Sequence, residues 1–210
     1  MDWREKVARE KRAAFAGEEY WGRPVPGFGN PDARVYVLGL APAAHGGNRT
    51  GRVFTGDRSG DWLFASMNRT GFANQPESRH PGDGLALRGA WIAAAVRCAP
   101  PANKPLPQER DSCLPYAAEE LRLIQPAVIV CLGKFAWDAA CQLLGIRPRP
   151  RFGHLAEHRT EGGPVLLGSF HPSQQNTFTG KLTEPMLDKV FERARKIAEE
   201  TVMMPRSKTP

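Results

Sequence analysis

The chain has 210 residues, a length that suits one α/β domain with a full core and is short for two. Its formal net charge of +7 favours a polyanionic partner, either nucleic acid or an anionic membrane surface. The N-terminus is charged and no apolar run is long enough to span a bilayer, so we expect no membrane segment and no secretory signal. These features predict a soluble, intracellular protein whose four cysteines are thiols or metal ligands.

Taken in chain order, the predicted elements alternate between helices, loops and strands. The first part contains a basic helix at 3–15, a Gly- and Pro-rich loop at 21–31, a buried strand at 34–40, a polar Gly-rich loop at 41–58, and a helix capped by Ser59. The middle contains a loop at 74–84, a strand at 91–96, a loop at 100–107, a helix at 108–123 and a strand at 127–132. The last part contains a helix at 133–144, an irregular segment at 147–158, a strand at 165–170, a loop at 171–180 and a helix at 183–201.

This alternation predicts one domain over residues 1–202, with a parallel sheet covered by helices on both faces, and a disordered tail at 203–210. In open α/β sheets, binding sites form beyond the carboxyl ends of the strands. The loops that follow the first, second and fourth predicted strands carry the unusual residues. The sequence therefore predicts a functional site at that edge of the sheet.

The loop after the first strand is rich in glycine, which permits a ligand to approach the backbone closely. It matches neither a P-loop nor a dinucleotide-binding fingerprint. Phe54 in this polar loop is either a stacking face for a flat ligand or an anchor in the core. Asp57 is either a catalytic carboxylate or a cap near the start of the next helix.

The loop after the fourth strand places His171 where the strand ends, followed by Pro172. A histidine there can donate a hydrogen bond to a carbonyl oxygen on which negative charge develops. The next residues offer neutral polar groups suited to phosphates and bases, and these are Ser173, Gln174, Gln175 and Asn176. The alternative is an ordinary polar turn.

Three motifs in this order carry a family resemblance: GLAPAAHGGNRTGRVFTGD at 39–57, AAVRCAPPANKP at 94–105 and SFHPSQQNTFTG at 169–180. Together they resemble the uracil-DNA glycosylase superfamily, and in particular its family 5, the type-B enzymes of bacteria and archaea. The resemblance extends from Arg4 to about Lys196. It implies a three-layer α/β/α sandwich around a four-stranded parallel sheet, and an enzyme that removes uracil and other deaminated bases such as hypoxanthine and xanthine from DNA.

The resemblance also implies three groups of site residues. The catalytic group is Asp57, His171 and Asn103. The base-binding group is Leu40, Ala41, Pro42, Phe54 and His171. The DNA-binding group is Ser173, which would grip a phosphate, and Gln174, Gln175 and Asn176, which would fill or probe the gap in the duplex.

Two positions depart from the pattern of most branches of the superfamily. Ala41 stands where an acidic residue or Asn positions the attacking water, which shifts that role to Asp57. Ala94 stands where other branches carry an Asn that reads the edge of uracil. A site without this hydrogen-bonding filter discriminates weakly, so we expect a relaxed choice of base.

The resemblance further implies a [4Fe–4S] cluster held by four cysteines. Cys98 and Cys113 match two of these ligands, and the N-terminal Cys-x-x-Cys pair is absent from the sequence. Either the natural start lies upstream, which we favour, or the cluster is incomplete, because two thiolates do not hold the usual cluster. Cys131 and Cys141 are expected to be buried as small apolar side chains.

The sequence thus favours a monofunctional, monomeric glycosylase that acts in the cytoplasm on DNA containing uracil, with no membrane partner. One alternative is a non-catalytic DNA-damage or redox-sensing binder on the same fold, which Ala41 and the incomplete cysteine set would permit. Another is a hydrolase of free nucleosides or nucleotides, which would have little affinity for DNA. The positive net charge argues against the second alternative.

Overall fold

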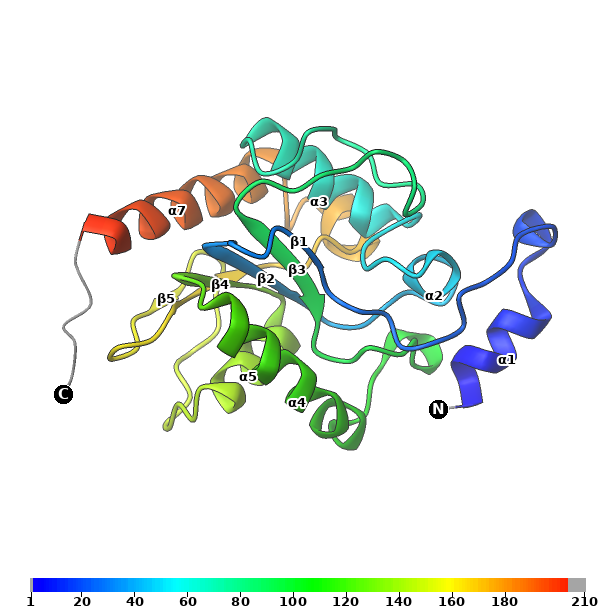
Figure 1. Ribbon diagram of the computed structural model, residues 1–210, viewed down its shortest axis with the longest axis horizontal. Helices are drawn as coiled ribbons and strands as arrows, with labels where there is room; N and C mark the ends of the chain where they lie inside the picture. Colours follow the sequence, from blue (N-terminus) through cyan, green and yellow to red (C-terminus); the bar gives the residue numbers. More distant parts are fainter. Residues whose placement is uncertain (1, 204–210) are drawn as a thin grey trace.

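A computed structural model describes residues 2–203 and shows a sheet of six strands at the centre of the molecule (Figure 1). The strands are β1 Phe28–Gly29, β2 Val35–Gly39, β3 Ala90–Ala94, β4 Val128–Leu132, β5 Glu157–His158 and β6 Val165–Ser169. Their order across the sheet is β1-β3-β2-β4-β6-β5. The four inner strands are parallel, and the two-residue strands β1 and β5 pair antiparallel at the edges.

Helices cover both faces of the sheet, as Figure 1 shows with α3 and α7 on one side and α4 and α5 on the other. Their bounds are α1 Asp2–Glu10, α2 Gly47–Thr50, α3 Arg58–Arg69, α4 Pro107–Ile124, α5 Lys134–Leu143, α6 Gln174–Phe178 and α7 Glu184–Met203. Two 3₁₀ helices, Ala13–Phe15 and Pro101–Asn103, complete the secondary structure of the described residues. None of the helices between residues 2 and 203 has the length and apolar character needed to cross a lipid bilayer.

The alternation of side chains along β2 divides the core into two layers. Val35 and Val37 belong to the cluster under α3 and α7, whereas Tyr36 and Leu38 belong to the cluster under α4 and α5. Because successive side chains of a strand point to opposite faces, an uninterrupted apolar strand such as this one must be covered on both sides. All four parallel strands are buried in this way, and their carboxyl ends form one edge of the sheet.

The structure confirms the α/β sandwich and corrects several details. The sheet has six strands rather than four, because two short edge strands lie in segments that were expected to be irregular or loops. The predicted helix at 3–15 ends at Glu10, and short helices lie inside the predicted loops at 41–58 and 171–180. Met203 is the last residue of α7 rather than part of a tail, and residues 204–210 lie outside the described residues.

A buried ion pair joins the loop that precedes α3 to the loop that follows it. Arg52 donates to Asp83 at 2.7 Å and to the Ser78 hydroxyl at 2.7 Å, and both charged side chains are less than a tenth exposed. Burial alone would raise the pKa of Asp83, but the Arg52 guanidinium and the backbone amides around it lower that pKa well below its usual range. The pair therefore fixes the segment that leads to Phe54.

Asp83→Asn should lower the free energy of unfolding by about 3 kcal/mol, because Arg52 would keep a buried charge without a counter-ion. Since the pKa of Asp83 is lower in the folded state than in the unfolded chain, the stabilisation is present above the unfolded value and is lost as the pH falls through the folded pKa. Urea unfolding of both proteins should therefore give a larger difference near pH 7 than near pH 3.

Glu119→Gln provides the control, because it makes a similar chemical change in an exposed ion pair with Arg122 on α4. This variant should unfold like the wild type, since exposed pairs contribute little. Equal stability of Asp83→Asn and the wild type at neutral pH would contradict the assigned role of the buried pair.

Candidate active site

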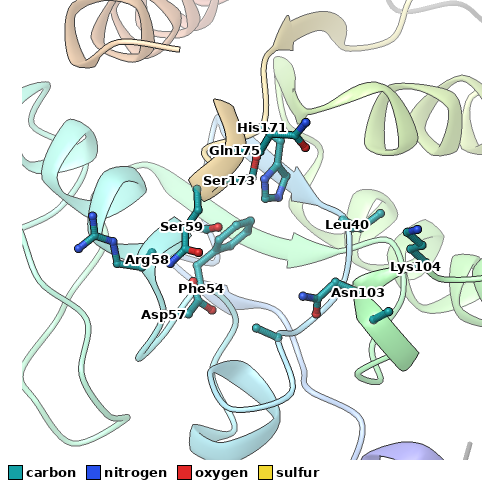
Figure 2. Close-up of a pocket in the computed structure, with 14 residues that line it drawn as sticks. Leu40, Phe54, Asp57, Arg58, Ser59, Asn103, Lys104, His171, Ser173 and Gln175 are labelled. Carbon is teal, nitrogen blue, oxygen red and sulfur yellow. The ribbon is translucent and has the colours of Figure 1, made fainter. Parts of the chain in front are cut away.

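A pocket of about 550 Å³ opens at the carboxyl ends of the parallel strands. Its walls come from the loops after β2, β3 and β6 (Figure 2). The lining residues are Leu40, Ala41, Ala43, Phe54, Asp57, Arg58, Ser59, Ala102, Asn103, Lys104, His171, Ser173, Gln174 and Gln175. Segments far apart in the sequence thus meet at the edge of the sheet where the chain pattern predicts a site.

Phe54 forms one apolar wall of this pocket. Its ring lies against Gly39, where an added Cβ would come within 2.6 Å of two ring carbons. Its backbone has a φ of +53°, which is unusual for a bulky residue. The carbonyl of Phe54 also lies so close to Gly60 that no side chain fits there. Glycines therefore let the loop hold the ring in a fixed position, with its centroid 6.1 Å from that of His171.

Asp57 is the N-cap of α3, and its carboxylate accepts a hydrogen bond from the Gly60 amide at 3.0 Å. The predicted cap was Ser59, which the structure places two residues further on, in the first turn of α3 and in the pocket wall. Burial raises the pKa of Asp57, and hydrogen bonds from the Gly60 and Ser59 amides partly offset that rise. A carboxylate of raised pKa is a better proton acceptor, and its negative charge lies where a positive charge could develop.

His171 enters the pocket from the end of β6. Burial lowers its pKa to about 4, so the imidazole is neutral near pH 7 and offers one N–H donor. The Asn176 amide donates to the His171 carbonyl at 2.9 Å, and a Cβ added at Gly133 would come within 3.3 Å of the His171 Cβ. An uncharged, firmly placed imidazole can donate to an oxygen that becomes negative during a reaction.

Asn103 lies across the pocket from Asp57, in the loop after β3 (Figure 2). Ala102 and Asn103 both have positive φ values, +53° and +55°, in a conformation that non-glycine residues rarely adopt. Backbone strain of this kind persists where the surrounding structure enforces it, and it often marks functional sites. Here the strained turn presents Asn103 and the exposed Lys104 to the same cavity.

The polar residues after His171 divide into two sets. Ser173, Gln174 and Gln175 line the pocket, and Ser173 is also the N-cap of α6. Asn176 does not line it, because its side chain holds the His171 carbonyl. Pro42 is not a lining residue either, since it is buried against Gly47, and the adjacent Ala43 lines the pocket instead.

Five lining residues were missed from the sequence: Ala43, Arg58, Ser59, Ala102 and Lys104. Each lies within two residues of a position that the motifs do single out. Closeness in sequence to Asp57 and Asn103 could have revealed most of them, because neighbouring side chains on a tight turn can enter the same space.

Cys98 and Cys113 lie together in a different cavity, of about 290 Å³, next to Pro24 and Arg97. Arg4 donates to the Cys98 sulfur at 2.9 Å, and the Arg97 amide donates to the Cys113 sulfur at 3.4 Å. Within residues 2–203, these two thiols are not joined by a third metal-binding side chain. The described residues thus supply half of the ligands that a [4Fe–4S] cluster needs, and alone they do not fit one. Cys131 and Cys141 are buried in the core, as predicted.

The His171 pKa can be measured before any reaction is assigned. A side-chain NMR titration should give a pKa of about 4, well below that of an ordinary histidine, because burial disfavours the charged imidazolium. His171→Gln identifies the signal by its loss. A midpoint at or above about 6.5 would contradict the buried, neutral imidazole.

The sequence of this chain is similar to those of known proteins. The sequence model of the uracil DNA glycosylase superfamily matches residues 26–195. A type-5 uracil-DNA glycosylase of Mycobacterium tuberculosis is 54% identical over 202 residues, which cover 94% of this chain and 75% of that protein. A type-5 uracil-DNA glycosylase of Thermus thermophilus is 49% identical over 198 residues, covering 93% of this chain and 90% of that protein.

A type-4 uracil-DNA glycosylase of Thermotoga maritima is more distant, at 31% identity over 150 residues, covering 71% of this chain and 69% of that protein. The higher identities to type-5 enzymes support a place in family 5. The family match spans the three loops that form the pocket. The chain therefore belongs to the uracil-DNA glycosylase superfamily.

Proposed function

We propose that this protein is a monofunctional uracil-DNA glycosylase of the type-B family, which takes an extruded base into the pocket described above and leaves an abasic site. One observation carries the proposal: Phe54, Asp57 and His171 meet in a single cavity with room for a nucleobase and its sugar. The net charge of +7, with Arg58 and Lys104 in the pocket wall, suits the DNA backbone. The enzyme acts as a monomer in the cytoplasm.

Hydrolysis breaks the bond between C1′ of the sugar and the base nitrogen. The bonding electrons leave with the base, the sugar passes through an oxocarbenium-like state, and water adds to C1′. Both charged fragments need fixed electrostatic partners more than a covalent catalyst. The pocket provides a carboxylate and a neutral histidine for these two fragments.

The base enters against the Phe54 ring, which lies against Gly39 and has its centroid 6.1 Å from that of His171. An aromatic ring held in place offers a face on which a flat base can stack. His171 donates to the carbonyl oxygen of the departing base. Asp57 stabilises the positive sugar and accepts a proton from the attacking water, assisted by the Asn103 amide. Extrusion itself costs a few kcal/mol, roughly, and least for a mispaired base.

The DNA outside the pocket is held by the polar rim. The Ser173 hydroxyl grips a phosphate, and Gln174 and Gln175 reach into the space that the extruded nucleotide leaves. Gln174 and Gln175 are exposed, Ser173 is half-buried, and all three line the pocket, which supports these contacts. Asn176 contributes through His171, because its amide is already bonded to the histidine carbonyl.

Asp57→Asn should reduce single-turnover release of uracil by about 100-fold or more, because one stabilising charge is lost from the site. Asparagine is as good an N-cap as aspartate, so α3 and the thermal midpoint should be retained. Wild-type activity should also decline on the acid side as Asp57, with its raised pKa, becomes protonated.

Binding of a duplex with an uncleavable uracil analogue is the control for this variant, and its affinity should equal that of the wild type. Wild-type-like uracil release by Asp57→Asn would refute the catalytic role of the carboxylate. Tight DNA binding by a wild type that releases no base would instead favour the non-catalytic binder.

The choice of base is expected to be relaxed. Ala94 is buried at the end of β3 and Ala41 lines the pocket, and neither has a side chain that can hydrogen-bond to the edge of a base. Sites that pair polar groups reject unsuitable ligands strongly, and sites without such groups do not. Ala94→Asn tests whether a polar side chain at this position restores discrimination.

Mass spectrometry of bases released from defined duplexes should detect uracil, hypoxanthine and xanthine with the wild type. Ala94→Asn should reduce the release of the two purines relative to uracil, with Ala94→Val as a control for side-chain size. Release of uracil alone by the wild type would rule out the relaxed pocket.

A further inference from the structure

Phe178 is the most exposed of the large apolar side chains described between residues 2 and 203, with 71% of its surface accessible. It is the last residue of α6, in the loop region after His171. Single exposed apolar residues are common in proteins, and Leu123 is 66% exposed at the far end of α4. Exposure alone therefore does not indicate a function for Phe178. The position of the ring relative to the pocket is more informative.

Two observations place Phe178 at the rim of the pocket. Gln174 and Gln175 line the cavity, and Phe178 follows them by four and three residues on the same short helix. Residues at these spacings lie on the same face of a helix. Arg58, which also lines the cavity, has its guanidinium carbon 5.6 Å from the centre of the Phe178 ring.

The guanidinium of Arg58 lies over the Phe178 ring in a cation–π contact. Arg58 is the first residue of α3 and directly follows Asp57, so the ring is connected to the loop that carries the carboxylate. Arg58 is exposed, and among the described residues it forms no ion pair within 4 Å. Its charge is therefore available for a phosphate while its guanidinium stays beside the Phe178 ring.

An extruded nucleotide leaves its neighbours in the duplex with unstacked faces. An aromatic ring at the rim can cover such a face, and stacking tolerates every base because each has a π-face. We propose that Phe178 stacks on the base next to the extruded nucleotide, while Arg58 holds the ring and contacts a backbone phosphate. This inference rests on the proposed function, since it places DNA over the rim.

The test uses a duplex with a tetrahydrofuran abasic analogue and 2-aminopurine beside it, so that no base is available for release. Phe178→Ala should weaken affinity by about fivefold to 100-fold, the range expected for the loss of one base–aromatic stack. It should also abolish quenching of the 2-aminopurine by the bound protein. Phe178→Trp should retain both properties, and Phe178→Leu should lose the quenching because it lacks a π-face.

Leu123→Ala is the matched control, because it removes a comparably exposed apolar side chain at the opposite edge of the sheet. It should bind the duplex like the wild type. All variants should keep the wild-type thermal midpoint, since Phe178 contributes little to the core. Wild-type affinity and quenching with Phe178→Ala would overturn the proposal, and so would full quenching with Phe178→Leu.

Single-turnover uracil release at saturating enzyme separates this inference from the glycosylase assignment. Phe178→Ala should release uracil within about threefold of the wild-type rate, because the stack supports binding rather than bond cleavage. A large loss of rate with unchanged affinity would overturn the stacking role and leave the glycosylase intact. A wild type that binds the abasic duplex and releases no uracil would refute the glycosylase alone.

Discussion

The hydrogen bond from the Gly60 amide to the Asp57 carboxylate contributes both to the fold of this enzyme and to the geometry of its candidate active site. It starts α3, which covers one face of the sheet, and it also holds the carboxylate at the cavity. The turn before it works only if Phe54 adopts a left-handed backbone and Gly60 lacks a side chain. The geometry of the site is thus fixed by the same contacts that begin a structural helix.

The parallel sheet was predictable because its strands leave a clear physical signature. Each inner strand is an uninterrupted apolar run, since both of its faces are covered, and helical segments separate the runs. The edge strands β1 and β5 have only two residues each, too few for a periodic pattern. The short helices α2 and α6 lie in polar loops, where capping and tertiary contacts rather than amphipathic spacing determine the structure.

The site was predictable to the extent that its residues lie just beyond strand ends, as His171 does after β6. Whether Asp57 was a cap or a site residue could not be decided from its neighbours, and the structure shows that it is both a cap and part of the pocket wall. Asn176 could not be assigned correctly from the sequence. Its residue type suits contacts with DNA, yet its side-chain amide already donates to the His171 carbonyl. Such pairings depend on the path of the chain in space, which composition and spacing do not reveal.

The glycines around Phe54 and Asp57 have a consequence for how this enzyme can diversify. Gly39 lies under the aromatic ring, Gly46 against the carboxylate and Gly60 against a backbone carbonyl, so a methyl group at any of them would displace a group that shapes the cavity. Substitutions at these three glycines would therefore disrupt the cavity rather than adjust its shape. New base preferences can arise more readily in the walls, where small side chains such as Ala41 and Ala43 leave space for larger ones.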